Sequence, residues 1–170
     1  LPDADVQQRL VHYIHKMVSC LEEDFLATLD IIIPLMTSNG SSLLNDFMRL
    51  VGQLISRFGA KFSHKVNAIL KPLTFEVFTL VRKGTAELSK NKEYNKAALE
   101  RSELGKEVTN LKLSYFNFLY TLVKSDVVQV LGSKENNSIL KEVLGVVKQG
   151  VLWWSNPNGQ RECWNIFGAL

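Results

Sequence analysis

The sequence has few cysteines, few prolines and no long apolar run, and each scarcity excludes a class of protein. Two cysteines among 170 residues, Cys20 and Cys163, cannot form a disulfide scaffold, so we expect a reduced, intracellular compartment. Four prolines and no low-complexity tract exclude a largely disordered chain. The longest apolar runs, such as that around 31–33, are far too short to cross a bilayer, so we expect no membrane insertion.

The ends of the sequence also lack the usual signals. The chain begins without Met and without a signal peptide, and it stops at FGAL, inside an apolar helical pattern. These features predict a piece of a longer chain.

What is present is a composition sufficient for one domain with a core, 46% apolar and 22% charged. The net charge of +3 is unevenly distributed. Residues 1–60 hold four Lys and Arg against seven Asp and Glu, whereas residues 61–170 hold sixteen against ten. A basic second half favours an acidic partner only weakly, because solvated helices carry lysine in any case.

Apolar residues recur with a period of 3.6 and almost never with a period of 2, which predicts an all-α protein. The expected helices fall into pairs at about 5–37, 42–84 and 104–152, with a partial repeat at 157–170. Gly59 and Gly84 are expected to end helices. The polar segment 85–103 is expected to be an insert.

Pairs of about forty residues have the size of a HEAT-type repeat, which stacks on its neighbours into a superhelix. A compact helical bundle remains the alternative. The apolar end at FGAL favours the stack, because a following repeat would cover it.

The stretch YIHKMVSCLEED, residues 13–24, contains His15 and Cys20, which together with His12 are candidate metal ligands. A metal needs three or four ligands that converge from one face, whereas Cys20 lies on a different face of the helix from His15. We therefore expect Cys20 to be buried and the histidines to edge the packed face. The sequence has no poised base beside either cysteine and no phosphate-binding glycine loop, so we expect no catalytic site, metal or cofactor.

Tryptophans flank the SNPNG turn at 155–159. They are Trp153, Trp154 and Trp164. Stacking on a nucleic-acid base is one interpretation. Closing the gap between neighbouring helices is the one we favour.

Two stripes of basic residues recur at helical spacing. The first holds Lys61, Lys65 and Lys71, with His64 beside them, and the second holds Lys134, Lys141 and Lys148. The second helix of each HEAT pair usually lines the concave surface, so two stripes of roughly 15–20 Å each would form a groove for a phosphate backbone. An ordinary solvated face is an equally good or better interpretation, and spacing alone names no partner.

Four blocks carry a resemblance to a known family. They are YIHKMVSCLEED (13–24), FGAKFSHKV (58–66), SYFNFLYTL (114–122) and KQGVLWWSNPNGQRECWNI (148–166). In order and spacing they resemble the C-terminal part of the tRNA exportins, export receptors of the karyopherin family. The resemblance covers most of the chain, and its blocks are packing and turn residues rather than a catalytic motif.

The resemblance implies a HEAT-repeat receptor that binds mature tRNA cooperatively with Ran-GTP. Such a receptor shuttles between nucleus and cytoplasm, contacts nuclear pore proteins and releases its RNA after GTP hydrolysis on Ran. It reads tRNA largely by shape and backbone, and each ligand raises the affinity for the other.

The chain departs from this family in two respects. The insert at 85–103 is longer than expected, and the main Ran-binding repeats belong to an N-terminal arch outside this chain. Our hypothesis is a non-enzymatic segment that contributes part of an RNA-facing surface through the two basic stripes. The alternative is a HEAT scaffold that binds a protein.

Overall fold

The computed structural model describes residues 4–21, 41–90, 101–153 and 157–169. In these ranges every regular element is a helix, so the predicted all-α class is confirmed. The elements are α1 (Ala4–Leu21), α3 (Ser41–Phe58), η2 (Gly59–Phe62), α4 (Ser63–Lys90), α6 (Glu103–Lys124), η3 (Val128–Gly132), α7 (Asn137–Trp153) and α8 (Pro157–Ala169). The helix expected at 22–37 lies outside the described residues.

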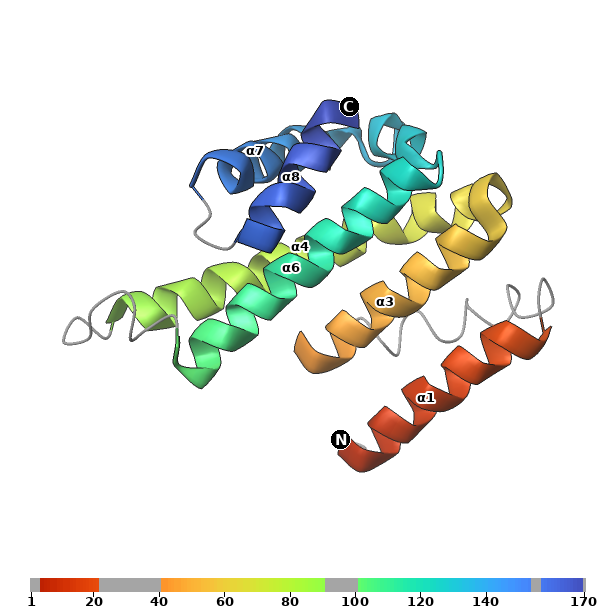
Figure 1. Ribbon diagram of the computed structural model, residues 1–170, viewed down its shortest axis with the longest axis horizontal. Helices are drawn as coiled ribbons and strands as arrows, with labels where there is room; N and C mark the ends of the chain where they lie inside the picture. The colour runs from red at the N-terminus through yellow and green to blue at the C-terminus, as the bar shows by residue number, and fades with distance from the viewer. Residues whose placement is uncertain (1–3, 22–40, 91–100, 154–156, 170) are drawn as a thin grey trace.

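The helices form two layers (Figure 1). Helices α1, α3, α6 and α8 make a row in which each contacts the next, while α4 passes behind α6 and α7 behind α8. Helix α4 contacts α3 and α6, and α7 contacts α8. First helices of successive pairs in one layer and second helices in the other give the predicted HEAT-like stack.

Helix α6 lies at the centre of the stack. It contacts α3, α4 and α8, and for this reason apolar residues are buried on several of its sides. They include Val108, Leu111, Tyr115, Phe116, Phe118, Leu119 and Leu122. The core therefore lies between the two layers, around α6.

Glycines mark one predicted helix end and contradict another. Gly59 has φ +52°, a left-handed conformation that glycine adopts without strain, and it follows α3 as predicted. Gly84 does not end a helix, because α4 continues to Lys90. A Cβ on Gly84 would collide with the Val108 side chain, so this glycine lets α4 and α6 approach closely.

The first residues of the predicted polar insert, 85–90, continue α4. Residues 91–100 lie outside the described residues, and α6 begins after Ser102, whose hydroxyl caps it by accepting from the Gly105 amide at 3.1 Å. The division into repeats remains a prediction.

Two burial predictions were wrong. Cys20 is exposed because it lies about 200° round α1 from the buried Val18. Trp164 is 56% exposed and so does not close a gap between the described helices. The side chains of Trp153 and Trp154 lie outside the described residues.

Candidate nucleic-acid interface

The first predicted basic stripe lies at the start of the second layer. Lys61 is in η2, His64 and Lys65 are in the first turn of α4, and Lys71 follows two turns later. Lys61, His64 and Lys71 are exposed, whereas Lys65 is half-buried. The other side of α4 is held in the core by Val66, Ile69, Leu70 and Leu73, which turns the stripe outward.

The second stripe lies on the same layer. Lys134 lies in the link between η3 and α7, and Lys141 and Lys148 lie on α7. All three are exposed, and α7 faces the core with Val143, Val147 and Val151. Both stripes therefore project from the α4–α7 layer.

Hydrogen bonds of the buried Asn136 fix the Lys134 segment against α4. The side-chain nitrogen of the buried Asn136 donates to Asn67 Oδ1 at 2.9 Å, to Asn67 O at 3.1 Å and to Val130 O at 3.0 Å. The pKa of Glu135 is lowered by hydrogen bonds to its carboxylate from the Asn67 side chain, from the Glu135 backbone and from the Ser133 side chain. Glu135 thus stays ionised and offsets part of the charge of the adjacent Lys134.

A second link, farther along α4, joins this helix to α7. The Arg82 guanidinium forms an ion pair with the Glu142 carboxylate of α7, and both side chains are exposed. Exposed ion pairs add about 1 kcal/mol at most. The pair therefore orients Arg82 toward α7 more than it stabilises the fold.

Phe75 is a further candidate contact residue on α4 that the sequence did not predict. Its side chain is 69% exposed, one helical turn beyond Lys71. Phe75 lies four residues after Lys71, so extending the helical spacing of the stripe by one turn would have found this residue. An exposed aromatic ring beside lysines can stack on an RNA base or contact an apolar side chain of a protein.

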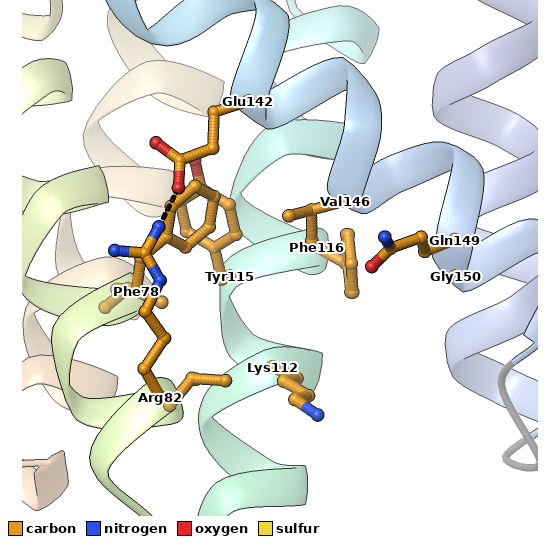
Figure 2. Close-up of a pocket in the computed structure, with 11 residues that line it drawn as sticks. Phe78, Arg82, Lys112, Tyr115, Phe116, Glu142, Val146, Gln149 and Gly150 are labelled. Atoms are coloured by element: carbon orange, nitrogen blue, oxygen red, sulfur yellow. Dashed lines mark hydrogen bonds and ion pairs between the residues drawn. The ribbon is translucent and has the colours of Figure 1, made fainter. Parts of the chain in front are cut away.

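A cavity of about 380 Å³ lies between α4, α6 and α7 (Figure 2). Its apolar lining comprises Val77, Phe78, Val81, Tyr115, Phe116 and Val146, and its polar lining Arg82, Lys112, Glu142 and Gln149. No sequence pattern predicted this cavity, because its lining is assembled from three helices.

The floor of the cavity is fixed by a buried polar pair. The hydroxyl oxygens of Thr74 and Tyr115 lie 2.9 Å apart, and the Phe78 ring meets the Tyr115 ring edge-on with centroids 5.5 Å apart. Burial raises the pKa of Tyr115 far above its usual range. The phenol is therefore neutral and acts as a structural group.

Lys112 brings a positive charge to the cavity. It is half-buried, and desolvation lowers the pKa of its ammonium group. It has no hydrogen-bond or ion-pair partner in the part of the chain that the structure describes. Lys112 thus offers a poorly hydrated ammonium group to a ligand.

The candidate metal ligands of α1 are not gathered into a site. His15 Nδ1 lies 2.7 Å from Gln53 Oε1 of α3, while His12 and Cys20 are exposed. Within the described ranges no three His, Cys, Asp or Glu side chains are placed to hold a metal ion. Over the same ranges, every helix is too short or too polar to cross a bilayer.

A family model for Exportin-T matches residues 11–168, nearly the whole chain. The chain belongs to the Exportin-T family. Exportin-T of Danio rerio is 27% identical over 159 residues, and that of Homo sapiens 25% over 166 residues; each match covers 93% of this chain. Exportin-T of Dictyostelium discoideum is 24% identical over 138 residues, 80% of this chain.

The chain spans only about 15% of the length of the animal relatives and 12% of the Dictyostelium one. No solved structure gives a significant match. All seven predicted basic residues and the whole cavity lining lie inside the Exportin-T match.

Proposed function

We propose that this chain is a HEAT-repeat segment of a nuclear export receptor that binds tRNA cooperatively with Ran-GTP and carries it from nucleus to cytoplasm. The Exportin-T match over residues 11–168 carries this proposal. The all-α stack with two basic stripes on one layer supports it, because an elongated positive surface suits a phosphate backbone. Ran-GTP binds the receptor mainly through repeats outside this chain, and nuclear pore proteins are further partners.

Within the segment, the phosphate contacts are assigned first to Lys71, Lys141 and Lys148. All three are exposed lysines on the α4–α7 layer. The phosphate contacts are assigned second to the remaining stripe residues, Lys61, His64, Lys65 and Lys134. Lys61 and Lys65 each have another interaction within the structure, and Glu135 offsets the charge of Lys134.

The test is charge reversal in the full-length protein that carries this chain. The triple variant Lys71→Glu, Lys141→Glu and Lys148→Glu is compared with Lys16→Glu, Lys106→Glu and Lys124→Glu, exposed lysines of α1 and α6. Affinity for folded tRNA is measured with Ran-GTP over a series of salt concentrations.

We expect the first triple variant to bind tRNA more weakly and with a salt slope smaller by up to about 3, about one per lost phosphate contact. The control carries the same change in net charge and should keep nearly the wild-type slope. Equal effects in both variants, or none in the first, would remove the α4 and α7 lysines from the interface.

One observation favours a second candidate function, a HEAT scaffold that binds a protein. Phe75 exposes a large apolar ring on the outer side of α4, and aromatic residues are enriched at protein interfaces. Such a scaffold would bind folded tRNA no better than an unstructured RNA of equal charge, whereas a tRNA receptor would prefer the folded RNA.

A further inference from the structure

The cavity between α4, α6 and α7 has the shape of a ligand site. Helices α4 and α7 supply its walls, and α6 supplies Tyr115, Phe116 and Lys112 (Figure 2). Its volume of about 380 Å³ lies within the range of small-ligand pockets. Tyr115 and Phe116 are almost wholly buried and Thr74 holds Tyr115 in place, so the floor is formed in advance of any ligand.

The polar groups of the cavity call for an anionic ligand with an apolar body. Lys112 lacks an acceptor among the described residues, and a half-buried ammonium group gains free energy when an anion contacts it. Arg82 and Glu142 already pair with each other at one edge. The exposed Gln149 amide can donate and accept hydrogen bonds at the edge of a planar ligand.

The surroundings of the cavity indicate that this ligand is part of a polyanion. Lys141 immediately precedes Glu142 in α7, and Lys148 immediately precedes Gln149, so exposed lysines border the residues that line the cavity. A chain of phosphates held by these lysines would pass beside the cavity. An isolated acidic side chain of a protein would leave these outer lysines without partners.

We propose that the cavity receives one unpaired nucleotide of the bound RNA, with its base against the apolar lining and its phosphate on Lys112. The proposal rests on the proposed function and adds to it a place where single-stranded RNA is held. The base is enclosed by Val81, Phe116 and Val146, and the Gln149 amide meets its polar edge. The lysine stripes hold the backbone, and the cavity distinguishes RNA with an unpaired base from a fully paired duplex.

The experiment uses the full-length protein with Ran-GTP and two RNA probes, folded tRNA and a blunt-ended RNA duplex without unpaired nucleotides. Lys112→Met removes the charge and keeps the length of the side chain. Val146→Phe fills the cavity without changing charge. Lys106→Met is the control, because this exposed lysine lies on the same helix and pairs with Glu103 at 2.7 Å.

We expect Lys112→Met and Val146→Phe each to weaken tRNA binding about tenfold, the scale of one base contact, and to leave duplex binding unchanged. Lys106→Met should behave as wild type with both probes. An equal loss on both RNAs would make Lys112 a general phosphate contact and overturn the proposal.

Other results also overturn it. Unchanged tRNA affinity in both cavity variants, with normal binding by the wild-type protein, would overturn the inference alone. If the two cavity variants bound Ran-GTP more weakly in the absence of RNA but bound tRNA normally, the cavity would be a contact for a protein and not for RNA. A wild-type protein that binds no tRNA in the presence of Ran-GTP would overturn the proposed function and this inference together.

Discussion

The contact between α3 and α6 and the boundary between α4 and α7 are built from different chemistry. Phe47, Leu50 and Leu54 of α3 and Leu122 of α6 are completely buried. Helix α4 is linked instead to the segment before α7 by the Asn67–Asn136 hydrogen bond and to α7 itself by the Arg82–Glu142 ion pair, with a cavity beside them.

This difference assigns different roles to the two layers. Apolar burial contributes most of the folding free energy, and it is concentrated around α6. The α4–α7 boundary keeps charges and open volume, which add little to stability and can bind a ligand. Substitutions in the first region should therefore change stability, and those in the second should change binding.

The largest effect is expected from Leu54→Ala, which removes a completely buried side chain of α3. The loss should be about 3 kcal/mol of unfolding free energy, because a cavity remains where the core was filled. The exposed Ser56→Ala on the same helix should stay within about 0.5 kcal/mol. Chemical denaturation measures both, and a loss below about 1 kcal/mol for Leu54→Ala would contradict the role given to this contact.

The next effect concerns the buried hydroxyl pair beneath the cavity. Thr74→Val leaves the Tyr115 hydroxyl without its partner, which should cost about 1–3 kcal/mol of unfolding free energy. Thr79→Val is the matched control, because the exposed Thr79 hydroxyl only donates to the Phe75 carbonyl at 2.8 Å. Equal unfolding midpoints for the two variants would show that the pair adds nothing.

Two glycines of α7 should respond with opposite signs. A Cβ on Gly150 would collide with Cys163 Sγ and lie 3.3 Å from Cys163 Cβ, so Gly150→Ala should destabilise by about 1–3 kcal/mol. A Cβ on Gly145 meets no atom within 4 Å, so Gly145→Ala should stabilise by about 0.5–1 kcal/mol. Thermal denaturation separates the two, and a shift of the same sign in both variants would refute the packing of α7 on α8.

The smallest effect should come from Lys112→Met. Burial lowers the pKa of Lys112 in the folded state below its unfolded value, so its charge destabilises the fold at neutral pH. This cost is fully present below the folded-state pKa and is relieved as the pH rises toward the unfolded value, about 10.4.

The Met variant should therefore melt at a slightly higher temperature than wild type at pH 7, and the gap should narrow near pH 10. Lys106→Met replaces an exposed lysine of the same helix and should raise the melting temperature at neither pH. A Lys112→Met variant that is less stable than wild type at pH 7 would assign this lysine a structural role.

The sequence predicted what a single helix determines. Gly59 marked the end of α3, and the helical spacing of the basic residues placed Lys71, Lys141 and Lys148 on exposed faces. Features that depend on how helices cross were missed. The Gly84–Val108 approach outweighs the helix-ending tendency of glycine, and the cavity combines Phe78, Lys112 and Glu142 from three helices.

Binding of fluorescent folded tRNA to the full-length protein, with and without Ran-GTP, decides whether this chain is part of a tRNA export receptor. An unstructured RNA of equal charge serves as the control ligand. We expect Ran-GTP to raise the affinity for folded tRNA strongly and to leave the control RNA weakly bound. An affinity for tRNA that is indifferent to Ran-GTP would contradict it and leave a HEAT scaffold whose partner is a protein.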